Sequence, residues 1–252
     1  MPERPTAGEF AAQLLDPAFS PQAVTSQDAD ADPDADAGPS SRWHGTDKAL
    51  RKLGLRRGAA IRVRDLTAVV SGRHVRTGVR VLPSGEVPDL TFKAPNSVSF
   101  VWSRLTPESR ADIQDAVLDS ASIALDRLAG DHLANEGTRS ALPFVSSLVL
   151  HVVGTLRPVN GIIVPLLHVH CCLWAVLDET GALTLPDEAT LYTEDALRSC
   201  DAVGEAQLAY RMETLGFPVR KTEGMEHSFE IAGVPRKLLD ADIWKNTGCA
   251  VA

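Results

Sequence analysis

The chain has 252 residues, of which 44% are hydrophobic and 23% are charged, a composition typical of a globular protein with a sizeable core. No apolar run reaches the roughly 20 residues of a membrane-spanning helix. The N-terminal sequence MPERPTAGEF also lacks the basic start and apolar block of a secretion signal. The composition therefore argues against a membrane or secreted protein and predicts a cytoplasmic one.

The net charge of −8 is concentrated near the N-terminus. Residues 1–41 contain eight acids and one base, a net charge of −7, which leaves about −1 for the rest of the chain. The run DADADPDADAGPSS repels itself and offers almost nothing to bury. We predict that residues 1–41 form a disordered acidic tail and that residues 42–252 form one folded domain.

Apolar residues at helical spacing and end signals predict helices at 46–55 with Thr46 as N-cap, at 61–72, at 107–128, at 191–217 and after Pro235. Alternating or continuous apolar runs predict strands at 89–95, 144–156, 165–177, 217–221 and 228–231. This order predicts an α+β fold, in which helices flank an antiparallel sheet.

Basic residues gather in the segment 51–80. A strongly positive segment suits the phosphate backbone of a nucleic acid, although a solvated helix face produces the same pattern. The near-neutral charge of residues 42–252 neither requires nor excludes DNA. The candidates for DNA contact in this segment are Arg51, Lys52, Arg56 and Arg57.

The four cysteines show no paired metal-binding spacing, and we expect reduced, mostly buried thiols. Adjacent Cys171 and Cys172 point to opposite faces if they lie on a strand. Of the four tryptophans, only Trp43 lies in a segment polar enough to be exposed, where it could stack on a base.

Two histidines lie one residue apart in the apolar stretch PLLHVHCCLW. On a strand, His168 and His170 share one face, so that both imidazoles can converge on one ion. Two imidazoles so placed suit a divalent cation, but hydrogen-bonded core histidines fit the same pattern. His151, on the neighbouring predicted strand, is the candidate for a third ligand.

Several motifs in the right order resemble the MobF-type conjugative relaxases, the TrwC- and TraI-like group of HUH endonucleases. They are RWHG with LGL (42–55), DLTFKAPNSVSFVW (89–102), the pattern TxRPVNGxxxPxLHxH (155–170), and AYRMETLGF with FEIAGVP (209–235). The likeness extends over residues 42–243. It implies an antiparallel sheet that carries the His-x-His strand and is packed with helices.

The resemblance also implies a function. Members of this group nick single-stranded DNA at a plasmid transfer origin and stay bonded to the 5′ phosphate through a tyrosine. Carried over to this chain, His168 and His170 are ligands of a divalent ion, Mg²⁺ or Mn²⁺, and His151 is the candidate third ligand. Asp89 is the carboxylate that either orients a ligand histidine or accepts the tyrosine proton.

The partners implied are single-stranded or hairpin DNA and other conjugation proteins. Further candidates for DNA contact are Lys93, Asn96 and Arg157. The chain ends at TGCAVA, so we expect no helicase region after the relaxase domain.

Three positions depart from the family pattern. The family's nucleophilic tyrosine lies near the N-terminus, but residues 1–41 contain none, and Tyr192 and Tyr210 fall in the predicted late helix. Alignment on Thr155 and Arg157 places Val153 at the third ligand position. Asn96 replaces a lysine that could meet a phosphate.

We therefore expect a relaxase domain whose strand transfer is impaired. One alternative is a DNA-binding relative without catalysis. Another is an unrelated metal-dependent hydrolase or oxygenase that shares only a His-x-His strand.

Overall fold

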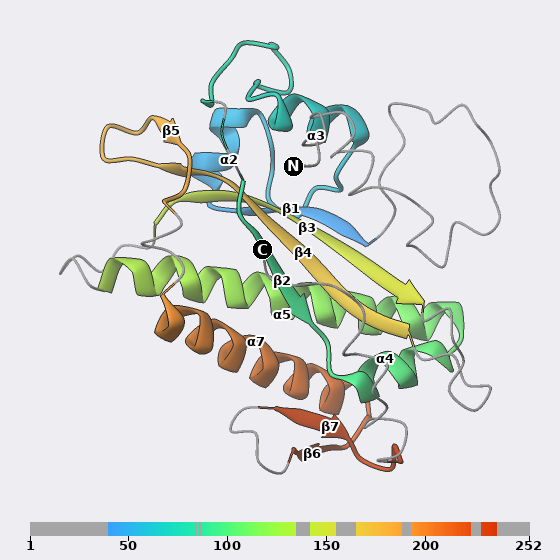
Figure 1. Cartoon of the computed structure of the whole chain (residues 1–252). Helices are drawn as coiled ribbons and strands as arrows, with labels where there is room; N and C mark the ends of the chain where they lie inside the picture. Colours follow the sequence, from blue (N-terminus) through green and yellow to red (C-terminus); the bar gives the residue numbers. More distant parts are fainter. Residues whose placement is uncertain are drawn as a thin grey trace, which may run out of the picture.

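The computed structural model describes residues 40–83, 85, 87–134, 142–154, 165–187, 193–222 and 228–235 (Figure 1). The predicted acidic tail lies outside these residues except for residues 40 and 41, and so does the helix predicted after Pro235. Among the described residues, no helix is long and apolar enough to cross a membrane.

One antiparallel sheet organises the chain. Its strands follow the order β1, β3, β4, β2, with β5 added beside β4. Their bounds are β1 Ser41–Gly45, β2 Asp89–Lys93, β3 Phe144–Gly154, β4 Pro165–Leu177 and β5 Leu183–Thr184. A separate ribbon pairs β6 Val219–Lys221 with β7 Phe229–Ile231. The predicted antiparallel α+β fold is confirmed, and β1 is a strand that the sequence did not predict.

The described helices are α2 Asp47–Leu53, α3 Val63–Val70, α4 Asn96–Ser103, α5 Pro107–Ala134 and α7 Glu194–Thr214. Four of them match predicted helices with shifted ends, whereas α4 was not predicted as an element. Thr46 is the N-cap of α2, but its side chain makes no capping hydrogen bond. Gly72 lies beyond the end of α3 with φ +70°, a left-handed conformation that glycine adopts without strain.

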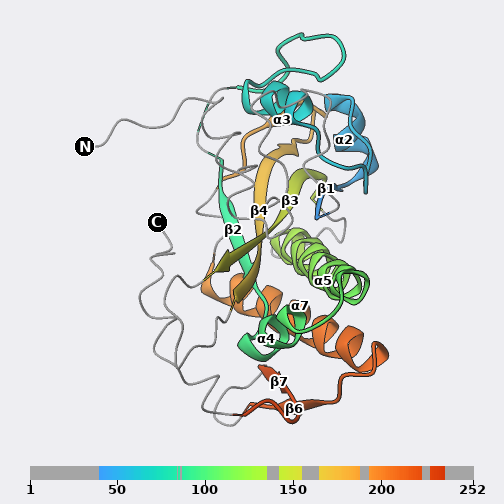
Figure 2. The same ribbon diagram turned by 90° about the vertical axis from the view of Figure 1, so that its right-hand side faces the viewer.

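Two apolar cores lie on the two faces of the sheet. The larger core joins the sheet to α4, α5 and α7, and includes Leu148, Val169 and Leu208. The smaller core joins α2 and α3 to residues such as Val149 and Trp174. Figures 1 and 2 show α5 and α7 running side by side along the sheet, whereas α2 and α3 gather at one end of it.

Trp43 belongs to the smaller core, where only 1% of it is exposed. The prediction of an exposed, base-stacking Trp43 is therefore wrong. The polar residues around it in sequence misled the prediction, because β1 pairs with β3 and places Trp43 opposite Ser147 on an interior face. The other described tryptophans, Trp102 and Trp174, are buried as predicted.

Candidate metal centre

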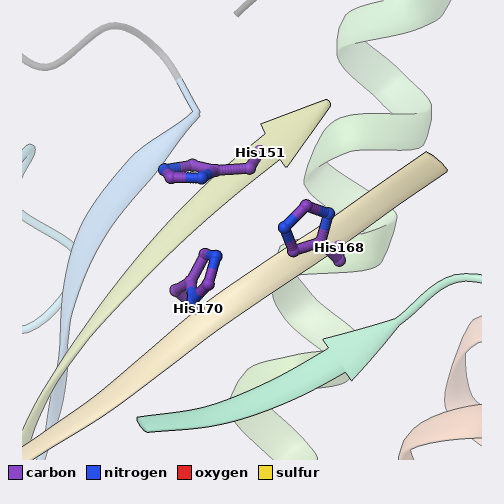
Figure 3. Close-up of side chains that lie close together, drawn as sticks. All are labelled: His151, His168 and His170. Carbon is purple, nitrogen blue, oxygen red and sulfur yellow. The ribbon is translucent and has the colours of Figure 1, made fainter. Parts of the chain in front are cut away.

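The register between β3 and β4 brings the three histidines together. His151 lies directly opposite His168, and Val149 lies opposite His170. Because side chains alternate between the faces of a strand, His151, His168 and His170 project from the same face. Figure 3 shows the three imidazoles turned toward one another from these two strands.

The side chains form a compact cluster. One ring nitrogen from each histidine lies within 4.8 Å of the other two. The ring centroids of His151 and His170 are 4.6 Å apart, and that of His168 is 5.0 Å from His170 and 5.7 Å from His151. The structure thus brings His151, and not Val153, to the His-x-His pair: Val153 lies opposite Leu166, and the only shift in register falls between Val145 and Ser146.

His168 is held in the form that binds metals. Its residue is 2% exposed. Burial, together with the positive charges of His170, His151 and Lys93, lowers the pKa of His168 from 6.5 to about 4, and the hydrogen bond with the backbone of Leu166 offsets only part of this change. A neutral imidazole offers a lone pair, so no proton needs to leave before a cation binds at neutral pH.

Hydrogen bonds set the orientation of two of the rings. The Nδ1 of His170 lies 2.6 Å from Oδ2 of Asp89, and the Nδ1 of His168 lies 3.5 Å from the backbone oxygen of Leu166. A carboxylate and a carbonyl only accept hydrogen bonds, so each neutral ring donates from Nδ1 and keeps its lone pair on Nε2. The Asp89 carboxylate therefore fixes the orientation of the His170 ring.

The residues fit a divalent cation. Three imidazole nitrogens are donors that bind first-row divalent ions, with metal to nitrogen distances of roughly 2.1 Å. Nitrogens within 4.8 Å of one another can close on such an ion by small side-chain rotations. Three protein ligands also leave coordination positions open for a substrate oxygen or water.

Lys93 is the predicted DNA contact that the structure places beside the histidines. It lies opposite His168 on β2, and its side chain is exposed on the same face of the sheet. Asp89 and Thr91 share that face of β2. A cation therefore lies next to the three imidazoles, where a phosphate that meets the metal would also meet the ammonium group.

The other predicted contacts lie elsewhere. Arg51, Lys52, Arg56 and Arg57 are exposed on α2 and the turn after it, at the end of the sheet that the smaller core covers. Arg57 is bound to Asp126 at 2.9 Å. Asn96 is the half-buried first residue of α4, and Arg157 lies outside the described residues.

No tyrosine of the described residues lies at the histidine cluster. Tyr210 is 63% exposed on α7, the helix whose Leu208 and Met212 pack into the core on the opposite face of the sheet. Tyr192 lies outside the described residues. The tyrosine chemistry implied by the resemblance therefore has no candidate within this part of the chain.

Sequence reasoning missed one contact of the site. The sulfur of Cys172 lies 3.8 Å from Oδ1 of Asp89. The signal was present in the spacing, because positions 168, 170 and 172 fall on one face of a strand. It was missed because the pairing between β2 and β4, which sets Asp89 opposite Cys172, is a tertiary contact.

Comparison with known protein families shows to which family the chain belongs. The family model described as TrwC relaxase matches residues 23–242, most of the chain and part of the predicted acidic tail. The chain belongs to the TrwC relaxase family. The resemblance seen in the motifs is thereby confirmed, and relaxase is the class of protein to which the chain is assigned.

Solved structures of TrwC share the fold. The metal-bound structure of the conjugative relaxase TrwC in complex with oriT DNA is 21% identical, with a TM-score of 0.59, over 80% of this chain and 69% of that one. TrwC complexed with a 27-mer DNA that comprises the recognition hairpin and the cleavage site is 21% identical, with a TM-score of 0.59, over 79% and 70%.

A copper-bound structure of TrwC with oriT DNA is 20% identical, with a TM-score of 0.59, over 78% of this chain and 66% of that one. No protein of curated function matched the chain. At these identities the solved structures establish the fold of the relaxase domain.

Proposed function

We propose that this chain is a DNA-binding relaxase domain in which His151, His168 and His170 hold a divalent ion, Mg²⁺ or Mn²⁺, for nicking at a plasmid transfer origin. The observation that carries the proposal is the convergence of three imidazoles, one of them oriented by Asp89. The solved TrwC relaxases support it, because they hold oriT DNA and, in one case, a recognition hairpin with the cleavage site.

Each residue at the site has a separate task. A divalent ion bound there would polarise the scissile phosphate and stabilise the negative charge that develops on it. Asp89 keeps His170 in the tautomer that presents Nε2. Lys93, exposed opposite His168, binds a phosphate oxygen of the DNA and takes over the cationic role that Asn96 cannot fill.

The described residues supply no tyrosine nucleophile for the proposed reaction. Residues 1–41 contain no tyrosine, and Tyr210 projects from the helix across the sheet. Among the described residues no phenol lies near the metal site, and a site that lacks one can bind and polarise a phosphate but cannot form the covalent phosphotyrosine bond. We therefore propose that strand transfer is impaired in this chain.

The lack of a tyrosine near the histidines, among the described residues, also favours a second candidate function, that of a DNA-binding relaxase relative without catalysis. This protein would recognise hairpin or single-stranded DNA and leave it intact. No observation favours the third class, an unrelated metal-dependent hydrolase or oxygenase, because the family match spans 23–242. In either proposed function the protein acts on plasmid DNA in the cytoplasm, beside other conjugation proteins.

The first experiment needs no knowledge of the DNA sequence. Mn²⁺ is titrated into the full chain by calorimetry, beside the double variant His168→Ala/His170→Ala. We expect micromolar binding by the unaltered chain and none by the variant. Absence of binding by both proteins would contradict the metal site.

The second experiment separates the two candidate functions. A pool of labelled hairpin and single-stranded oligonucleotides is enriched for binding, and the selected DNA is incubated with the protein and Mn²⁺. Nicking that the double variant abolishes supports the endonuclease, and a labelled protein band on a denaturing gel would show a covalent adduct and contradict impairment. Binding without nicking supports the second candidate.

A further inference from the structure

A buried chain of polar contacts leads from the smaller core to the histidine cluster. The Nε1 of Trp174 donates to Oγ of Ser147 at 2.9 Å, and Ser147 lies opposite Cys172 and hydrogen-bonds its sulfur. The thiol of Cys172 in turn donates to Oδ1 of Asp89 at 3.8 Å. The other oxygen of Asp89 binds His170, so these contacts end at the candidate metal centre.

The side chains that make this series of contacts are almost completely buried up to Asp89. Ser147 and Cys172 are 0% exposed, and Trp174 is 2% exposed. The sulfur of Cys172 lies within hydrogen-bonding distance of Oδ1 of Asp89, and a carboxylate only accepts, so the thiol serves Asp89 as a hydrogen-bond donor.

We propose that Cys172 is a positioning residue, which acts on the metal centre through Asp89. Its S–H group fixes Oδ1, so that Oδ2 stays on Nδ1 of His170 and the Nε2 lone pair of that ring faces the cluster. Without the thiol, the carboxylate is free to rotate toward solvent, because 32% of the Asp89 side chain is exposed. The proposal rests on the proposed metal-binding function.

The chain contains a matched control for this role. Cys171 is the adjacent thiol, and it is 2% exposed. Its side chain points to the opposite face of β4, where its sulfur contacts the backbone oxygen of Val169 at 3.6 Å. Replacement of either cysteine removes the same atoms from the same strand, but only Cys172 touches the carboxylate.

The test compares Cys172→Val with Cys171→Val in the full chain. In metal-free protein labelled with ¹⁵N-histidine, NMR reports the tautomer of His170, and calorimetry reports the Kd for Mn²⁺. We expect Cys172→Val to reduce the fraction of His170 in the Nδ1–H tautomer. The variant should also weaken Mn²⁺ binding about three- to tenfold, which is no more than the lower end of the loss usually seen when a residue that orients a metal ligand is replaced. Cys171→Val should leave the tautomer unchanged and the Kd within about twofold.

Two further variants keep the test decisive. Cys172→Ser retains a donor and should preserve the tautomer better than Cys172→Ala, which is the substitute if the valine variant does not fold. In an Asp89→Ala background, loss of the thiol should no longer change the Kd, because the effect passes through the carboxylate.

Equal tautomer fractions and equal Kd values in the two cysteine variants would overturn the proposal. If the unaltered chain binds no Mn²⁺, the proposed function fails, but the tautomer of His170 in the metal-free protein still decides the role of Cys172.

Discussion

The two faces of β4 differ in how completely they are covered. On one face, Val169, Cys171 and Leu173 all lie in the larger core. On the other face, Trp174 and Cys172 lie in the smaller core, but His170 and His168 continue past it. One strand therefore carries a continuous apolar face and a second face that changes from core to candidate site along its length.

Helix length accounts for this difference. With 28 residues, α5 is about 42 Å long, nearly the length of the 13-residue β4 at about 43 Å. The helices on the other face, α2 and α3, have 7 and 8 residues and are only about 11 to 12 Å long. They can cover one end of the sheet, and the histidines occupy the end that they leave.

The largest expected effect is on Mn²⁺ affinity, and it comes from removal of the histidines on the face of β4 that α2 and α3 cover only at one end. His168→Ala/His170→Ala should weaken Mn²⁺ binding by about 100-fold or more, because two of three imidazole donors are lost. Calorimetry at pH 7 measures the change. The control is Val169→Ala, between the two histidines but on the other face, which should lower the Tm and keep the Kd for Mn²⁺. Similar Mn²⁺ affinity in the two variants would contradict the division of the faces.

The next effect should come from the covered face. Leu148 on β3 is 0% exposed in the larger core. Leu148→Ala should lower the free energy of unfolding by about 2–4 kcal/mol, since it removes buried atoms and leaves a cavity. Urea denaturation measures the loss, and the Kd for Mn²⁺ should remain unchanged in the folded variant. A loss below about 1 kcal/mol would show that this face is less tightly packed than we infer.

A smaller effect is expected where α5 passes the edge strand β1. Asp126 accepts from Nε2 of the buried His44 and from Arg57, both at 2.9 Å. Asp126→Asn should cost about 1–2 kcal/mol at pH 7, because the amide cannot accept both bonds, although partial exposure of Asp126 limits the loss.

The effect of Asp126→Asn should depend on pH. Burial raises the pKa of Asp126, but the contacts with His44 and Arg57 outweigh it and lower the pKa below the usual 3.8. The carboxylate therefore stabilises the fold above pH 3.8, and this contribution is lost as the pH falls through the lowered value. Urea denaturation at pH 7 and at pH 3 should show that the difference in free energy of unfolding between the unaltered chain and Asp126→Asn becomes smaller in acid. A difference that is the same at both pH values would exclude the charge of Asp126 as its cause.

The smallest effect concerns DNA. Lys93→Gln should weaken oligonucleotide binding a few-fold and lower the slope of log K against log salt by about 1, since one phosphate contact is lost. Fluorescence anisotropy over a salt series measures both. The control is Arg198→Gln on α7, across the sheet, which also removes one positive charge. It should change neither the affinity for the oligonucleotide nor the slope of log K against log salt. Equal effects of the two variants would point to net charge rather than to a contact at the site.

The sequence predicted most of the secondary structure, because the signals are local. Apolar spacing located α5, β3, β4 and α7, and alternation located β2. It missed β1, since SRWHG has no clear alternation and becomes a strand by pairing with β3. It also missed α4, whose eight residues follow directly on a predicted strand.

Local spacing was enough to predict that His168 and His170 share a face, because a strand repeats every two residues. The order of the motifs also identified the relaxase family and Asp89 as a residue of interest. Strand pairing, by contrast, makes His151 the third imidazole of the cluster and brings Cys172 into contact with Asp89. Both depend on the register between strands far apart in the chain, which is set by how the two cores pack and not by local spacing.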